Sequence, residues 1–260
     1  MTRKWLFSCT FLILIVVFFS CKGKNSSSSS LSPTPSPSTP QNNSGVGKVG
    51  SLARFTVIGD HLYAVNNREI KAFDISNPAE TKEVSGQSID FGIETVSGSY
   101  PYLFIGGQKG LYIYDVSSDP KSPSFVSQFG HARACDPVVI ENDYAFITLR
   151  SSNMCPGSVN ELKVVDVSNI RQPKLIKNYP LSAPVGLASN EGKLYICDGD
   201  NLKLFNSSDV QNVQLKTSVE RIGCMDMIFD RSAVIVTSSQ GITQYDVSND
   251  IFELLSHLGF

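Results

Sequence analysis

The stretch "LKVVDVSN", residues 162–169, ends an apolar run in an aspartate that is followed by an apolar residue and a serine. The same motif returns as "IKAFDIS" on Asp74, "LYIYDVS" on Asp115, "LKLFNSS" on Asn206 and "ITQYDVS" on Asp246. With Asp166, these five anchor residues follow one another at spacings of 41, 51, 40 and 40. The long interval contains "SSNMCPGSVN", residues 151–160, which has no counterpart elsewhere. The chain therefore carries five copies of one unit of about 40 residues.

Each unit predicts four short β-strands. Apolar residues recur at fixed offsets from the anchor and alternate along short segments, which is typical of strands and not of helices. Turn-forming pairs such as Asn66-Asn67 and Asp198-Gly199 separate the second segment from the third. We therefore expect an all-β fold, a β-propeller of about five four-stranded blades in which neighbouring blades cover both faces of a sheet. A β-solenoid is the alternative, although its coils usually repeat at shorter periods.

The anchored motif resembles the signature of the LVIVD-repeat family of exported bacterial and archaeal proteins, which reads apolar-x-apolar-x-Asp-apolar-Ser. "LKVVDVSN" and "LYIYDVSS" match it closely, and the resemblance covers nearly the whole chain after residue 47. The fourth unit departs from it, with Asn206-Ser207-Ser208 in place of Asp-Val-Ser. The resemblance implies a β-propeller at the cell surface and says little about activity.

The anchors themselves are interpreted as turn residues. An Asp or Asn at a strand end accepts backbone N–H groups two residues further on, and a following Ser does the same more weakly. A catalytic role would need five equivalent sites, yet no His or second carboxylate keeps a fixed offset from the anchors. The Asp-x-Ser motif therefore predicts local turn structure.

The N-terminus predicts export. Arg3 and Lys4 precede an uncharged, mostly apolar run, and the run ends in Ser20-Cys21. This arrangement is typical of a secretory signal peptide, here residues 1–20. The position of Cys21 resembles the lipobox of bacterial lipoproteins, which implies that Cys21 carries acyl chains such as palmitate and becomes the new N-terminus. Ordinary cleavage and an uncleaved anchor are the alternatives.

Residues 21–47 are expected to form a disordered tether. The segment "NSSSSSLSPTPSPSTPQNNS", residues 25–44, carries no charge and almost no apolar side chain, so it cannot offset the entropy lost on ordering. Residues 48–260 then form the propeller domain. The formal net charge is −2, and the basic residues are scattered, which argues against a nucleic-acid partner.

Cysteines in the propeller predict disulfides, because an exported chain meets an oxidising compartment. Cys155 lies in the insertion and Cys135 lies at the start of the same unit, so a bond between them would pin the insertion. On the chain-entropy model such a bond stabilises by about 3 kcal/mol. Cys197 and Cys224 fall in neighbouring units and are either bonded or buried as free thiols. The spacing of these cysteines does not favour zinc.

Polar residues at the innermost strands are the candidate binding site. The position twenty residues before the anchor, allowing for the insertion, is Arg54, Thr95, Asp136, Gly186 and Asp226. The first strand of a propeller blade lines the central channel, so Asp136 and Asp226 can face it together with Arg54 and Glu94. The alternatives are a solvated channel wall and a site that holds a ligand or metal at the channel mouth.

These patterns predict a lipid-anchored, non-catalytic binding module of the cell envelope, at the outer membrane or cell surface. Its expected contacts are the membrane, through the lipid, and a protein or glycan partner. No cofactor is expected, and neither G-x-S-x-G nor H-E-x-x-H occurs. The competing reading is an extracytoplasmic hydrolase or lyase that uses Asp136 and Asp226. Five complete units predict a monomer with a closed ring, and a dimer that completes an open arc is the alternative.

Overall fold

Twenty strands form five antiparallel sheets in the part of the chain that the computed structural model describes, residues 50–131, 137–151, 157 and 159–260. Each sheet takes its four strands in chain order. Blade 1 contains β1 (Phe55–Ile58), β2 (His61–Val65), β3 (Glu69–Asp74) and β4 (Lys82–Ser88). Blade 2 contains β5 (Ile93–Ser99), β6 (Tyr102–Gly107), β7 (Gly110–Asp115) and β8 (Ser124–Gly130). Blade 3 contains β9 (Val138–Glu141), β10 (Tyr144–Leu149), β11 (Glu161–Asp166) and β12 (Lys174–Pro180). Blade 4 contains β13 (Pro184–Asn190), β14 (Lys193–Asp198), β15 (Asn201–Asn206) and β16 (Gln214–Val219), and blade 5 contains β17 (Cys224–Asp230), β18 (Ala233–Ser238), β19 (Gly241–Asp246) and β20 (Glu253–Gly259).

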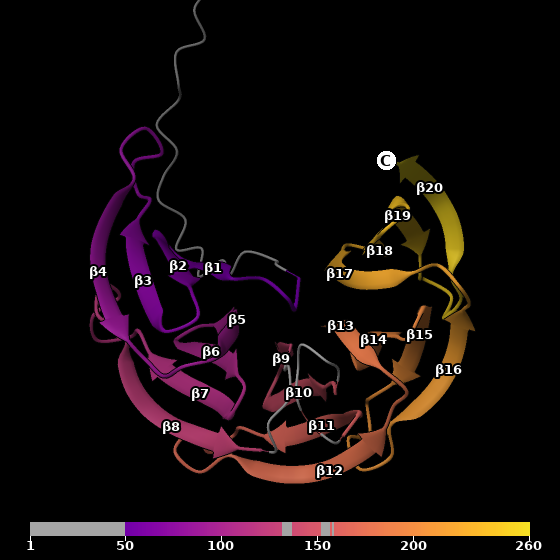
Figure 1. Cartoon of the computed structure of the whole chain (residues 1–260), viewed down its shortest axis with the longest axis horizontal. Helices are drawn as coiled ribbons and strands as arrows, with labels where there is room; N and C mark the ends of the chain where they lie inside the picture. Colours follow the sequence, from indigo (N-terminus) through magenta and orange to yellow (C-terminus); the bar gives the residue numbers. More distant parts are fainter. Residues whose placement is uncertain (1–49, 132–136, 152–156, 158) are drawn as a thin grey trace, which may run out of the picture. The chain divides into compact units, whose positions relative to one another are not determined.

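The five sheets lie around a common centre as the blades of a β-propeller (Figure 1). The first strand of each blade is innermost and the fourth is outermost, so β4, β8, β12, β16 and β20 form the outer rim. The prediction of an all-β propeller with five four-stranded blades is confirmed. No described segment forms a helix that is long and apolar enough to cross a lipid bilayer.

The anchors end the third strand of every blade and form the expected turns. The side-chain oxygen of each anchor accepts the backbone N–H two residues further on, at 2.7–3.0 Å. A β-bulge also recurs at a fixed distance from the anchor. In all five blades the register between the third and fourth strands shifts at the residue before the anchor. Five repeats of one local geometry account for the fixed spacing of the motif.

The hydrophobic core lies between consecutive blades. We call the side of a blade that faces its successor the forward face. In blade 4 this face consists of Ala188, Tyr195, Cys197, Leu202 and Leu204, all of them buried. They pack against Met227, Val234 and Val236 of blade 5. Comparable clusters join blades 1 and 2, 2 and 3, and 3 and 4.

Blades 1 and 5 lie on either side of an opening in the ring (Figure 1). Within the described residues, strands that pack across blades join each blade to its neighbour in sequence, and none of these pairs joins blade 1 to blade 5. The forward face of blade 5, which is Ile228, Ile235, Thr237, Ile242 and Gln244, is accordingly half-buried or exposed. The structure does not show the closed ring on which the expectation of a monomer depends.

Because successive strands run in opposite directions, the loops that connect them lie alternately at one edge of the propeller and at the other. The insertion edge carries the turns between second and third strands and the links from one blade to the next, which include residues 66–68, 89–92, 108–109 and 199–200. Ser151 and Asn160, the first and last residues of the insertion in the third unit, lie between β10 and β11 and therefore at this edge as well. The anchor edge carries the first turn of each blade and the Asp-x-Ser turns. Side chains gathered at either edge come from several blades.

Candidate functional site

Asp226 lies at the inner end of the contact between blades 4 and 5, where it holds the segment that leads into β1. Its Oδ1 accepts a hydrogen bond from Ser51 Oγ at 3.2 Å, and its Oδ2 accepts one from the backbone N–H of Leu52 at 3.4 Å. Ser51 Oγ in turn accepts the backbone N–H of Leu187 in β13 at 2.8 Å. We call Gly50–Leu52 the strap, because it joins the start of blade 1 to blades 4 and 5.

The strap and the glycines around it bury the Asp226 carboxylate. A Cβ on Gly186 of blade 4 would lie 2.6 Å from Oδ1 of Asp226, so only glycine leaves room there. Burial raises the pKa of Asp226, and the hydrogen bonds from Met227, Ser51 and Leu52 oppose that rise without cancelling it. Both carboxylate oxygens therefore serve the chain's own backbone and hydroxyl groups.

The other predicted channel residues do not converge on Asp226. Arg54 is exposed, its backbone carbonyl accepts the N–H of Val65 at 2.8 Å, and no ion pair links it to Asp226 in the described part of the chain. Glu94 lies in the bulge of β5, and its Oε1 accepts a hydrogen bond from Gln108 at 3.4 Å. Asp136 lies outside the described residues. Within the described ranges, no group of three or more His, Cys, Asp or Glu side chains is placed to hold a metal.

One disulfide crosses the contact between blades 4 and 5. It joins Cys197 on the forward face of blade 4 to Cys224 at the start of β17, with the two Cα atoms 5.2 Å apart. Both residues are buried. Cys21, Cys135 and Cys155 lie outside the described residues, so the predicted lipidation and the predicted bond of the insertion stay predictions.

A polar and aromatic cluster projects from the insertion edge of blades 1 and 2. Phe91 is 48% exposed, and the guanidinium carbon of Arg68 lies 5.1 Å from the centre of its ring. Beside it, Asp90 pairs with Lys109 at 3.0 Å and accepts a hydrogen bond from Tyr112 OH at 2.8 Å. These hydrogen bonds hold the pKa of Asp90 below its ordinary range. We call these five residues the Phe91 cluster.

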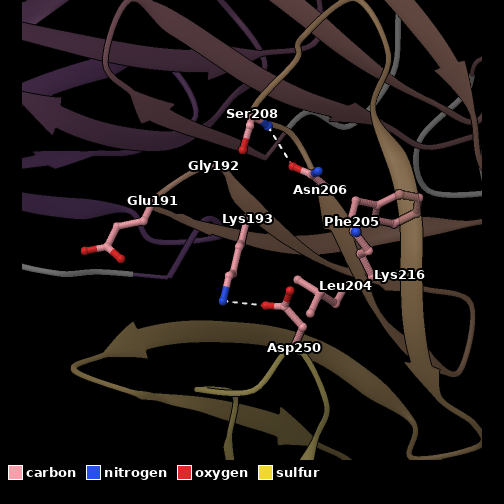
Figure 2. Close-up of a pocket in the computed structure, with 9 residues that line it drawn as sticks. All are labelled: Glu191, Gly192, Lys193, Leu204, Phe205, Asn206, Ser208, Lys216 and Asp250. Atoms are coloured by element: carbon pink, nitrogen blue, oxygen red, sulfur yellow. Dashed lines mark hydrogen bonds and ion pairs between the residues drawn. The ribbon is translucent and has the colours of Figure 1, made fainter.

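A pocket of about 180 Å³ opens at the anchor edge between blades 4 and 5. Figure 2 shows Lys193 of β14 and Asp250 of the last anchor turn pointing toward one another, and their charged atoms are 2.5 Å apart. Glu191, Phe205 and Lys216 complete its main lining. Like the Phe91 cluster, this pocket brings charges of both signs together, and Leu204 adds an apolar residue to its lining.

A second pocket occupies the equivalent position between blades 2 and 3. It forms where the first residue of the second strand approaches the fourth residue after the next anchor. Between blades 2 and 3 these residues are Tyr102 and Ile170, and they line a pocket of about 230 Å³. The charged pair Lys193 and Asp250 replaces this apolar pair between blades 4 and 5. Aligning the five units by their anchors would have revealed the substitution, which our sequence reasoning missed.

Comparisons with known proteins agree with the fold. The family model of the LVIVD repeat matches residues 49–86, 95–130 and 132–180, which correspond to blades 1 to 3. These matches support the resemblance to the LVIVD-repeat family. No curated protein sequence matches the chain.

Similar solved structures are distant in sequence. A protein from Lactobacillus plantarum superposes with a TM-score of 0.62 at 14% identity, over 78% of this chain and 73% of that one. BamB from Moraxella catarrhalis superposes with a TM-score of 0.52 at 13% identity, over 80% of this chain and 64% of its own. Hsv2 from Kluyveromyces lactis has a TM-score of 0.53 at 11% identity, over 77% of this chain, and this chain spans only 59% of it. At such identities the likeness concerns the fold alone.

Proposed function

We propose that the protein is a lipid-anchored, exported β-propeller that works as a non-catalytic binding module at the cell envelope. Propellers position variable loops on a rigid frame, and recognition by such loops is their common use. The proposal places the recognition surface at the insertion edge, which carries the Phe91 cluster and the insertion of the third unit. Its partner is a protein or a glycan.

The Phe91 cluster is the observation that carries this proposal. An aromatic ring that is half exposed and stacked with an arginine is typical of the residues that dominate binding at protein interfaces. The Asp90–Lys109 pair and the Tyr112 hydroxyl hold the adjacent loop in place without covering the ring. The cluster therefore presents a preorganised surface, and less entropy is lost when a partner binds to it.

The test compares two exposed phenylalanines on opposite edges. Phe91→Ala removes the centre of the cluster, whereas Phe125→Ala removes a ring that is 58% exposed at the start of β8, near the anchor edge. Full-length protein carrying each change is cross-linked in cells, and the captured partners are identified by mass spectrometry. We expect Phe125→Ala to keep a partner that Phe91→Ala loses. Equal capture by the two variants would contradict the placement of the surface.

Anchoring is tested separately at the N-terminus. Cys21→Ala should release the protein from the membrane fraction, and mass spectrometry of the wild-type N-terminal peptide should show an acylated Cys21. Cys9→Ala is the matched control, because Cys9 lies within the apolar run of the signal peptide. An unmodified wild-type peptide that contains Cys21 in mid-chain would exclude lipidation.

The competing function, a hydrolase or lyase, would use Asp226, whose pKa is raised as a general acid requires. Both of its oxygens, however, accept hydrogen bonds from the strap. We therefore expect no turnover of chromogenic esters or glycosides. Turnover by the wild type that Asp226→Asn abolishes would replace the binding function with an enzymatic one.

A further inference from the structure

The pocket between blades 2 and 3 is open because one side chain at its edge is short. Between blades 3 and 4, the last residue of β9, Glu141, reaches the first turn of blade 4 and accepts the N–H of Gly192 at 2.9 Å. Ser99 holds the equivalent position at the end of β5, and it lines the pocket. Serine is too short to make the contact that Glu141 makes. A space of about 230 Å³ therefore remains between blades 2 and 3.

Aromatic and apolar side chains line much of this pocket. Phe104 and Val167 are buried in the core between blades 2 and 3, so they form its inner end. Tyr100 and Tyr102 line it from blade 2, and Tyr100 is 54% exposed. Tyr100 lies in the turn between β5 and β6. The other four blades have Gly59, Asn142, Glu191 or Arg231 at this position, so blade 2 alone places an aromatic ring there.

One carboxylate of the pocket has no counter-charge. Asp143, in the turn between β9 and β10, is exposed and makes no ion pair in the described part of the chain. Among the described residues that line the pocket, none is Lys, Arg or His. Arg171 lies nearby in sequence, but hydrogen bonds from Ser117 and the charge of Arg171 together lower the pKa of Asp115, so this cation already has a partner. The lining is therefore negatively charged beside two tyrosine rings.

This combination favours an organic cation as the ligand. The face of an aromatic ring attracts a cation, more strongly when the cation leaves water, and a carboxylate adds a full opposite charge. A primary ammonium group needs acceptors for three N–H donors, whereas a fully methylated ammonium group has no N–H and gains from apolar contact. Because apolar and aromatic residues predominate at the inner end of the pocket, the methylated group fits it better.

We propose that the pocket between blades 2 and 3 binds a methylated ammonium group such as that of choline, carried by a small molecule or by a lipid headgroup. Tyr100 and Tyr102 contact its methyl groups, and Asp143 supplies the counter-charge. The volume of about 230 Å³ lies below the range of about 300–1,000 Å³ that is usual for ligand pockets, so the site takes one small head group. This ligand is additional to the partner proposed for the Phe91 cluster, which lies at the opposite edge of the propeller.

Saturation-transfer NMR on the full-length protein in a non-ionic detergent tests the inference. The probes are choline, glycerophosphocholine, ethanolamine and the neutral alcohol in which a carbon atom replaces the nitrogen of choline. We expect saturable binding of choline, and binding of ethanolamine and of the neutral alcohol that is weaker by about tenfold or more. Tighter binding of glycerophosphocholine than of choline identifies a lipid headgroup as the source, and equal or weaker binding identifies a free small cation.

Paired variants locate the site. Tyr100→Ala should weaken choline binding by about tenfold, whereas Tyr100→Phe should keep it, because the ring and not the hydroxyl contacts the cation. Asp143→Asn should weaken binding by about tenfold and remove most of its dependence on salt. Both side chains are exposed, so the variants should fold, and their melting temperatures check this.

Asp60→Asn is the matched control. Asp60 holds the position of Asp143 in the first turn of blade 1, and the carbonyl of each accepts the N–H of the residue after the anchor, from Ile75 and Val167. No blade packs in front of this turn with a tyrosine, because blade 1 borders the opening of the ring. Asp60→Asn should therefore leave choline binding unchanged.

Equal binding of choline and of its neutral analogue would overturn the inference, and so would tighter binding of ethanolamine than of choline. Absence of choline binding is a contradiction as well, as is binding that neither Tyr100→Ala nor Asp143→Asn weakens. Capture of a partner through Phe91 depends on none of these results, so failure of this inference and failure of the proposed function are distinguishable.

Discussion

The forward faces of blades 4 and 5 occupy equivalent positions in the repeat and have opposite surroundings. Blade 5 covers the forward face of blade 4, where Tyr195 and Leu204 are buried. The corresponding Ile235 and Gln244 of blade 5 have no blade in front of them and are only half-buried. The comparison teaches that one repeat sequence serves either as core or as surface, and that the residue two before the anchor differs accordingly. The residue two before the anchor is apolar in the first four blades, where it is Ala72, Ile113, Val164 or Leu204. In blade 5 it is the polar Gln244.

Truncating the aromatic ring of the covered face should give the largest effect. Tyr195→Ala is expected to lower the free energy of unfolding by about 3–5 kcal/mol, because it leaves a cavity between two blades. Ile235→Ala, the same position in blade 5, should cost about 1 kcal/mol or less, because the site is partly open to solvent. Denaturant unfolding of both variants measures the difference. Equal losses would mean that another element covers blade 5 in solution.

The disulfide sharpens the same contrast, because blade 5 has Thr237 where blade 4 has Cys197. Removing the bond with Cys197→Ala and Cys224→Ala should cost about 3.5 kcal/mol on the chain-entropy model, because it opens a loop with a sequence separation of 27 residues. Reductant should lower the melting temperature of the wild type by more than that of the double variant, which keeps only the predicted bond between Cys135 and Cys155. A melting temperature that is insensitive to reductant in the wild type would show that the bond is absent in solution.

Exchanging the residues two before the anchor should affect the two blades unequally. Leu204→Gln places an amide in the covered face without a partner and should cost about 2 kcal/mol or more. Gln244→Leu should change stability by no more than about 0.5 kcal/mol, as is usual for surface sites. Thermal unfolding of each single variant provides the measurement. A gain in stability from Leu204→Gln would refute the view that this face is sealed.

Asp226 gives the smallest effect, and its sign depends on pH. Burial raises the pKa of Asp226 in the folded protein above its value in the unfolded chain. Below the pKa of the unfolded chain the carboxyl group is protonated in both states, so its burial does not lower the stability. Stability is lost as the pH rises through the pKa of the folded protein. Asp226→Asn should therefore gain stability over the wild type as pH rises toward neutral, by no more than about 2–4 °C in melting temperature.

The anchor Asp166 supplies the opposite control. Hydrogen bonds from Ser168 lower its pKa, so its contribution to stability is present above the unfolded pKa and is lost as pH falls through the folded pKa. Asp166→Asn should thus be less stable than the wild type at neutral pH, and the deficit should vanish in acid. Parallel pH profiles for the two variants would contradict the burial of Asp226.

Features that repeat were predictable from the sequence, and features that depend on non-equivalent neighbours were not. The anchors, the four strands and the turn role of Asp-x-Ser follow from local chemistry in each unit. The hydrogen bond of Ser51 to Asp226 joins the segment before β1 to β17 of blade 5, and no period marks it. The pairing of Lys193 with Asp250 requires knowing which positions of successive units meet. The number of units suggested a ring closed by blades 1 and 5, with an open arc as the alternative, and that number alone could not decide between the two.

The strap also orders the events of folding. Contacts within a blade span about 40 residues, whereas the hydrogen bond from Ser51 to Asp226 joins residues 175 apart in sequence. Closing so long a loop is slow and costs more entropy than forming contacts within a blade. The blades can therefore form in succession before the strap binds to Asp226. In a chain made from its N-terminus, the Ser51 hydroxyl lacks its acceptor Asp226 until the first strand of blade 5 has been made. Binding of the strap to Asp226 therefore occurs only in a chain whose fifth blade has begun to form.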